Sequence, residues 1–194
     1  VELTDSMIAD SGRLTAFFRI LDDIAARREK VVVFVQHFGV QDVVARAIRA
    51  RYGLDHMPGK INGTMPPAAR QRVVTEFQDG RPGFDAVVLT GRAAGTGLTL
   101  TAANHVVHLE RWWNPAVEDQ CSDRVYRIGQ TKDVMVHVPL AVFREEVDPA
   151  DSPFDVTLHQ FLERKRSRSQ SVLAPSSGKG DQEFIESFFG KKAD

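Results

Sequence analysis

Short, unbroken runs of apolar residues recur along this chain, and each run is too brief to form a helix. Runs of this kind, rich in β-branched residues, are typical of strands buried on both faces of a sheet. They lie at residues 30–36, 85–90, 105–109 and 134–138, and a weaker strand is expected between Leu54 and Ile61. We expect the strands to be parallel, with 30–36 in a central position.

Between these runs, apolar residues recur at helical spacing. A first helix is predicted from a cap at Ser11 to about Arg28, and a second helix ends near Gly53. A third helix is expected to begin at Pro66 and Pro67, with a core face of Val73, Val74 and Phe77. A short helical turn is expected around residues 98–103. A further helix is expected from a cap at Asn114, with Pro115 in its first turn, to about Tyr126. Strands that alternate with helices predict an α/β fold, a doubly wound parallel sheet flanked by helices.

The composition changes near Arg144, where acidic residues and prolines are typical of a connector. We therefore expect one domain over residues 1–143 and a second part over 144–194. Within that part a helix is predicted at 152–166, with an apolar stripe of Phe154, Leu158, Phe161 and Leu162. Ser-, Pro- and Gly-rich residues up to Gly180 predict a flexible loop, and the aromatic cluster at 184–189 is expected to dock on another surface. The fold thus gains a C-terminal helical extension.

Charge and cysteine content narrow the class of protein. The 25 Lys+Arg and 26 Asp+Glu give a formal net charge of −1, which excludes a globally basic nucleic-acid coat and leaves a local patch for any polyanion. The single cysteine, Cys121, excludes an internal disulfide and favours a reducing, intracellular compartment. No apolar run is long enough to span a membrane, and no targeting signal is expected at the start, which lacks Met and suggests a fragment.

Polar and glycine-rich residues follow the predicted strands, and ligands of doubly wound sheets bind at the carboxyl ends of the strands. The Gly95-x-Gly97 turn is typical of phosphate contact or simply of a tight turn. Arg124 and Arg127 would share one face of a helix, which fits either binding of a triphosphate or a solvated basic helix end. Trp112 and Trp113 fit either a core or the rim of a ligand site.

Several well-known sites are missing from the sequence. The stretch Gly178-Lys179-Gly180 lacks the upstream glycine and the following hydroxyl residue of a phosphate loop, so we interpret it as linker. The six histidines show no metal-ligand spacing, so we expect no metal site and a structural or surface role for each. No nucleophile elbow is present.

The order of motifs resembles one family. LTGRAAGTGLTLTAANHVVHLERWWNPAVEDQCSDRVYRIGQTKDVMVH, at residues 89–137, is similar to the fifth and sixth motifs of Swi/Snf-type ATP-dependent DNA translocases, which belong to the superfamily-two helicase-like motors. KVVVFVQ at 30–36 and ING at 61–63 match earlier motifs. The resemblance covers residues 11–140 strongly and 152–173 weakly, and it implies a RecA-like fold for the second, C-terminal lobe of such a motor.

The resemblance also implies roles for individual residues. Arg124 and Arg127, with Gln120, match the sixth motif, whose arginines touch the γ-phosphate across the cleft as charge develops in the transition state. Gly95, Gly97 and Leu98 match the fifth motif, between nucleotide and DNA. The residues that match DNA-strand contacts are Gln36, Asn62, Gly63, Thr90 and Arg92, and those that match the coupling of DNA to the cleft are Trp112, Trp113 and Asn114.

The implied cofactors are ATP and Mg, held mainly by the first RecA-like lobe of the parent protein, which is absent here. The implied partners are that lobe and double-stranded DNA, with no membrane; the location is intracellular, cytoplasmic (nucleoid) or nuclear. The sequence departs from the family pattern at Gly91, Ala94, Thr99, Glu110 and Tyr126, which affects DNA coupling more than hydrolysis. Two alternatives remain: a non-catalytic RecA-like module that binds DNA or protein, and the lobe of a related RNA helicase. The isolated lobe is expected to be inactive.

Overall fold

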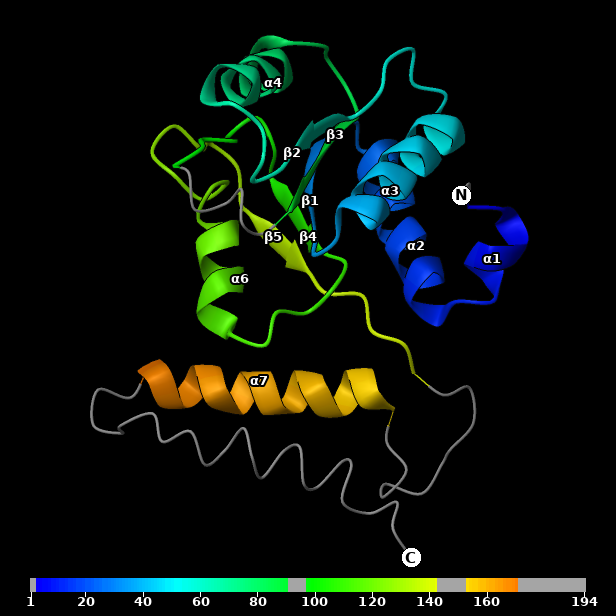
Figure 1. The fold of residues 1–194 in the computed structure, drawn as a ribbon, viewed down its shortest axis with the longest axis vertical. Helices are drawn as coiled ribbons and strands as arrows, with labels where there is room; N and C mark the ends of the chain where they lie inside the picture. The colour runs from blue at the N-terminus through cyan, green and yellow to red at the C-terminus, as the bar shows by residue number, and fades with distance from the viewer. Residues whose placement is uncertain (1–2, 91–96, 143–152, 171–194) are drawn as a thin grey trace, which may run out of the picture.

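The computed structural model of the chain describes residues 3–90, 97–142 and 153–170. Its centre is a sheet of five strands in the order β2-β3-β1-β4-β5, and every neighbouring pair is parallel (Figure 1). The bounds are β1 Lys30–Val35, β2 Gly59–Ile61, β3 Asp85–Thr90, β4 His105–His108 and β5 Met135–His137. All five predicted strands are confirmed, with the first of them at the centre of the sheet.

Helices cover both faces of this sheet, which confirms the doubly wound architecture (Figure 1). The bounds are α1 Asp5–Ala9, α2 Gly12–Ala26, α3 Phe38–Tyr52, α4 Pro67–Asp79, α6 Pro115–Ser122 and α7 Phe154–Gln170. Side chains alternate along β1: Val31 and Val33 pack with α2 and α3, whereas Val32 and Phe34 pack with α4 and α6. Each face of the sheet therefore has its own hydrophobic core, as two-sided burial of apolar strands requires.

Local signals in the sequence explain where several helices begin and end. Ser11 accepts a hydrogen bond from the amide of Leu14 and caps α2, and Asn114 accepts one from the amide of Ala116 and caps α6. Gly53 ends α3 in the left-handed conformation, with φ of 60°, which glycine adopts without steric cost. The predicted caps at Ser11 and Asn114 are thus confirmed.

The predicted end of α6 near Tyr126 is wrong, because the helix ends at Ser122. From Asp123 the chain continues in turns that bury Val125 completely in the core. Farther along, the side-chain amide of Gln130 donates to the carbonyl oxygen of Ala103 at 2.6 Å and holds the chain beside the start of β4. Burial of Val125 and the contact of Gln130 with Ala103 stabilise the turns after Ser122. The helix therefore ends there and does not continue to Tyr126.

Two short segments also differ from expectation. Residues 98–103 contain a single hydrogen-bonded turn, with the amide of Ala103 donating to the carbonyl of Leu100, and no helix. The helix α1, capped by Thr4, was not predicted, because it is one of the shortest elements and buries no residue completely. Periodicity does not identify an element of this length.

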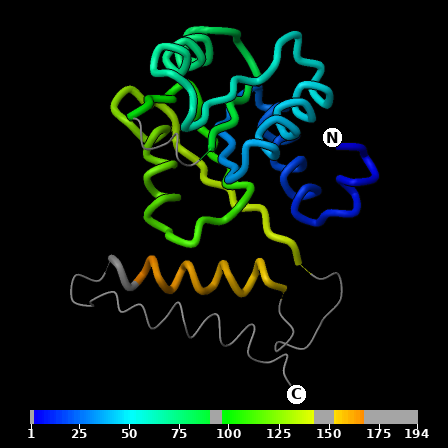
Figure 2. The backbone as a smooth tube through the Cα atoms, in the orientation of Figure 1, coloured from blue at the N-terminus to red at the C-terminus, as the bar shows by residue number. Residues whose placement is uncertain are grey.

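Helix α7 forms the C-terminal extension and packs beside α6 (Figure 2). Leu158 and Leu162 face inward, as the predicted stripe requires, whereas Phe154 is half exposed. The predicted connector, the loop up to Gly180 and the aromatic cluster at 184–189 lie outside the described residues, and the division at residue 143 stays a prediction. Among the described helices, none combines the length and apolar character needed to cross a bilayer.

Candidate functional site: the carboxyl edge of the sheet

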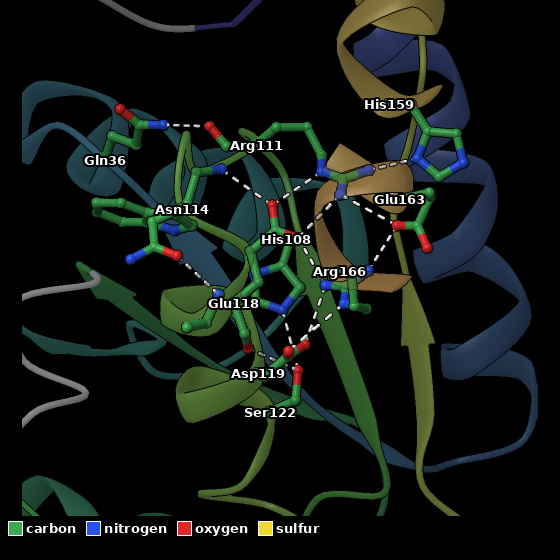
Figure 3. A network of polar contacts seen from close by, with 12 residues as sticks. Gln36, His108, Arg111, Asn114, Glu118, Asp119, Ser122, His159, Glu163 and Arg166 are labelled. Carbon is green, nitrogen blue, oxygen red and sulfur yellow. Dashed lines mark hydrogen bonds and ion pairs between the residues drawn. The ribbon is translucent and has the colours of Figure 1, made fainter. Parts of the chain in front are cut away.

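The carboxyl ends of all the strands lie along one edge of the sheet, because every strand pair is parallel. Several of the predicted site residues lie in the described segments that follow β1, β2 and β4. Beside β1 and β4 this edge carries a continuous polar network (Figure 3).

Gln36 follows β1 and is held by the loop after β4. Its backbone amide donates to the carboxylate Oε2 of Glu110 at 2.6 Å. Its side-chain Nε2 donates to the carbonyl oxygen of Arg111 at 2.6 Å (Figure 3). The structure therefore joins two segments that were predicted separately as DNA-contacting elements. We call residues 110–114 the tryptophan loop.

A buried ion pair supports the tryptophan loop from below. Arg111 donates through Nε and Nη2 to the two carboxylate oxygens of Glu118 on α6, at 2.8 and 3.0 Å, and the two side chains are 5% and 3% exposed. Glu118 also accepts a hydrogen bond from the backbone amide of Trp112 at 2.9 Å. A two-point Arg–carboxylate pair of this kind fixes geometry strongly, since separation inside the protein leaves each charge buried away from water and without its partner.

The network extends to α7 through Arg166. Its Nη2 lies 3.3 Å from Oε2 of Glu118 and 3.0 Å from Oδ1 of Asp119, both on α6 (Figure 3). Arg111 in turn contacts His159 and Glu163 of α7. Sequence reasoning missed Arg111, Glu118 and Arg166. One signal was present: Pro115, Glu118 and Cys121 share the core-facing spacing of α6, and a carboxylate at such a position needs a buried partner.

The two tryptophans of the loop have different surroundings. Trp112 is partly buried, and its indole nitrogen is buried without a hydrogen-bond partner among the described residues. Trp113 is 40% exposed and lies against Phe161 of α7, with ring centroids 5.5 Å apart. The side-chain oxygen of Asn114 caps α6. Of the two tryptophans, Trp113 is therefore the more exposed to solvent.

The turn after β2 and the last residue of β3 also lie at this edge. Asn62 accepts hydrogen bonds from the amide and hydroxyl of Thr64, at 3.1 and 2.8 Å, and Gly63 beside it is exposed. Thr90 ends β3 and is buried, and its hydroxyl has no partner in the part of the chain that the structure describes. The predicted site residues Arg92 and Gly95 lie outside the described residues.

Arg124 and Arg127 lie in the turns after α6, so the prediction that they share a helix face is wrong. Their segment instead contacts residues 97–100. Nη1 of Arg127 donates to the carbonyl oxygen of Gly97 at 3.1 Å and to the hydroxyl of Thr99 at 3.3 Å, and the carbonyl of Arg124 accepts from the amide of Leu100 at 2.9 Å.

The remaining predicted nucleotide residues differ in exposure. Leu98 is buried in the core, where it anchors the segment that Arg127 contacts, whereas Gln120 is exposed on α6. Nε of Arg124 is buried and has no hydrogen-bond partner among the described residues. Arg124 and Arg127 therefore offer guanidinium donors beside an exposed glycine turn, and such donors suit an anionic oxygen.

Burial sets the ionisation of two groups beneath this edge. Desolvation lowers the pKa of His108 to about 4, and it raises the pKa of the Cys121 thiol to about 12. His108 is therefore neutral at pH 7 and Cys121 is not a thiolate. Within the described ranges, His, Cys, Asp and Glu side chains do not gather in threes as metal ligands.

The parallel strand order and the helices on both faces define a RecA-like lobe. The family described as Helicase conserved C-terminal domain matches residues 13–129, and this chain belongs to that family, as the C-terminal lobe of a Swi/Snf-type superfamily-two protein. The Sulfolobus solfataricus SWI2/SNF2 ATPase core in complex with dsDNA is similar, with a TM-score of 0.65 and 28% identity over 90% of this chain and 35% of that one.

Curated relatives show the same family. Zorya protein ZorD of Escherichia coli O139:H28 (strain E24377A / ETEC) is 34% identical over 90% of this chain. The putative ATP-dependent helicase/translocase YwqA of Bacillus subtilis (strain 168) is 36% identical over 76% of it. This chain spans 16% of the length of each of these two relatives.

Proposed function

We propose that this lobe is the second half of an ATP-dependent motor that moves along duplex DNA. The observation that carries the proposal is the contact between residues 97–100 and 124–127 at the carboxyl edge of the sheet. These segments match the fifth and sixth motifs, one assigned to the connection between nucleotide and DNA and the other to the arginines. Because the two segments are in contact, this part of the edge can reach both the nucleotide and the DNA.

In this proposal Arg124 and Arg127 act on the nucleotide held by the first lobe of the parent protein. ATP with its magnesium supplies the phosphoryl group and much of the charge. The two guanidinium groups stabilise the negative charge that grows on the phosphoryl oxygens, an effect confined largely to the transition state. The buried Nε of Arg124, unpaired among the described residues, is a donor that fits such an acceptor.

DNA binding in this proposal uses the same edge, through Gln36, Asn62, Gly63, Thr90 and Arg92 on the strand-end turns and through the tryptophan loop. Backbone amides and side-chain donors in such turns suit phosphate oxygens, which carry no sequence information. The solved SWI2/SNF2 core that contains dsDNA supports this assignment by similarity. DNA as a substrate also implies an intracellular location.

The experiment that tests the proposal is an ATPase assay of the intact parent protein with duplex DNA, single-stranded DNA or duplex RNA. We expect duplex DNA to stimulate turnover most strongly, and we expect displacement of a triplex-forming strand from that duplex as evidence of movement. Stronger stimulation by RNA indicates the related helicase branch instead. Turnover that no nucleic acid changes contradicts the proposal, and the absence of any turnover favours a non-catalytic module.

The isolated lobe should not bind ATP strongly. Exposed ion pairs contribute roughly 0 to 1 kcal/mol, so two arginines without a phosphate loop should give an affinity no better than about millimolar. Calorimetric titration of ATP into the 194-residue chain, with and without duplex DNA, measures this. Micromolar binding or turnover above the blank requires a nucleotide site that the half-motor account lacks.

A further inference from the structure

Helix α7 is fixed to the lobe at both of its ends by charged side chains. Near its first turn Asp155, which is buried, accepts hydrogen bonds from Nε of Arg13 on α2 at 3.0 Å and from the amide of Ala141 at 2.9 Å. Near its other end Arg166 binds Glu118 and Asp119 on α6. Leu158 and Leu162 pack inward between these two attachments. The helix therefore has a defined position relative to α6.

The attachment at Arg166 reaches the tryptophan loop through one carboxylate. Oε2 of Glu118 lies 3.0 Å from Nη2 of Arg111 and 3.3 Å from Nη2 of Arg166, and Oε1 accepts from the amide of Trp112. Two guanidinium groups from different elements thus share one buried carboxylate with the backbone of the loop (Figure 3). A shift of α7 changes the balance of charge around Glu118 and, through it, the hold on Arg111 and Trp112.

From Arg111 the connection continues to β1. The carbonyl oxygen of Arg111 accepts from the side chain of Gln36, and the neighbouring Glu110 accepts from the Gln36 amide. The chain of contacts runs from α7 through α6 and the tryptophan loop to the turn after β1. Each link is a hydrogen bond or an ion pair, and the central pair is almost fully buried. Burial makes the central pair of Arg111 and Glu118 sensitive to the loss of either partner, whereas Arg166 joins this pair from a more exposed position, with a side chain 23% exposed.

We propose that Arg166 is a positioning residue for DNA: it uses Glu118 to hold the tryptophan loop and Gln36 in the geometry that engages the duplex. The inference rests on the proposed function, because it takes this edge of the sheet as the DNA-facing edge. Arg166 itself does not touch DNA. Helix α7 thereby sets the geometry in which this lobe engages DNA.

The test compares Arg166→Ala with Arg164→Ala in the intact parent protein. Both changes remove one positive charge from α7, but Arg164 is exposed and its side-chain hydrogen bond, at 3.4 Å, goes to the carbonyl of Gln160 within the same helix. Coupling through such networks is worth roughly 0.5 to 2 kcal/mol, so the DNA concentration for half-maximal ATPase stimulation should rise about two- to thirtyfold in Arg166→Ala alone. Arg166→Lys should fall between the two, because it keeps the charge without the two-point geometry.

Two further readouts separate positioning from a general loss of structure. Amide exchange of the peptide containing Trp112 should become faster in Arg166→Ala, while the KM for ATP, the DNA-free ATPase and the thermal midpoint stay at the values of Arg164→Ala. Equal DNA titrations for the two variants overturn the inference. A parallel fall in the DNA-free ATPase and the thermal midpoint overturns it as well, because it shows a purely structural role. If DNA does not change the ATPase turnover of the unsubstituted parent protein, both the proposed function and the inference are overturned. This measurement needs no variant, so the two failures are distinguishable.

Discussion

Arg127 and Gly97 meet at the carboxyl edge of the sheet, where the guanidinium Nη1 donates to the glycine carbonyl oxygen at 3.1 Å. Gly97 adopts a φ of 72° and is exposed, so the carbonyl belongs to a left-handed turn that suits glycine. The contact links the turn before Leu98 to the turns after α6. In our account it holds Arg127 close to the place where the nucleotide of the parent motor arrives.

Thr99 should help to position Arg127. Its hydroxyl accepts from Nη1 of Arg127 at 3.3 Å, and Thr99→Val removes that acceptor while keeping the shape of the side chain. A hydrogen bond of this kind contributes roughly 0.5 to 1.5 kcal/mol, so kcat of the intact parent should fall about two- to tenfold, with a small change in the KM for ATP. Steady-state ATPase kinetics at saturating duplex DNA measure both constants.

The matched control is Thr101→Val, since the hydroxyl of Thr101 accepts from the side chain of Gln78 and not from an arginine. This control should keep kcat at the parental value. A Thr99→Val protein that is indistinguishable from the control removes Thr99 from the account.

Binding of DNA should depend steeply on salt and hardly on sequence if the strand-end turns contact phosphates. Replacing Arg92 with Ala in the intact parent should then lower the slope of log K against log salt by roughly one unit. Fluorescence anisotropy with duplexes of unrelated sequence at several salt concentrations measures this. A flat salt dependence, or a strong preference for one duplex, contradicts phosphate contact at this edge.

His108 should make the stability of the lobe fall in mild acid. Burial lowers its folded-state pKa to about 4 from an ordinary value of 6.5, so the unfolded chain binds the proton more readily than the folded one. Its contribution is fully present above about pH 6.5 and is lost as the pH falls through about 4. The difference amounts to about 3 kcal/mol in order of magnitude.

Urea unfolding of the 194-residue chain at pH 7 and pH 4.5 tests this contribution. The substitution His108→Gln keeps a donor for Ser122 but removes the titrating ring, so the variant should lose less stability between the two pH values than the parent chain. An equal loss in both proteins means that other groups cause the acid sensitivity.

The layout of the fold was predictable because its signals are local. The apolar runs at 30–36 and 85–90 reveal buried strands, and Ser11 and Asn114 act as the caps that their types and positions suggest. The end of α6 was not predictable in this way. It depends on the burial of Val125 and on the bond from Gln130 to Ala103, which come from tertiary contacts that helical periodicity does not record.

The candidate site, too, was predictable only in part. The resemblance located the segments that carry Arg127 and Trp113, and the structure brings the segments around them to one edge. The ion pairs that hold the tryptophan loop were not predicted. Arg111 in a loop pairs with Glu118 on the core-facing side of a helix, and Arg166 comes from an element far along the chain. Charged residues usually lie at the surface, so sequence alone favours an exposed position for all three of them.

We propose that Arg124 and Arg127 stabilise charge in the transition state of ATP hydrolysis by the parent motor. The most direct measurement is kcat for the intact protein with saturating ATP and duplex DNA, for the parent and for the variants Arg124→Ala and Arg127→Ala. We predict a fall on the order of 10³-fold for each variant, with DNA affinity little changed. Turnover within about tenfold of the parent for both variants contradicts the claim.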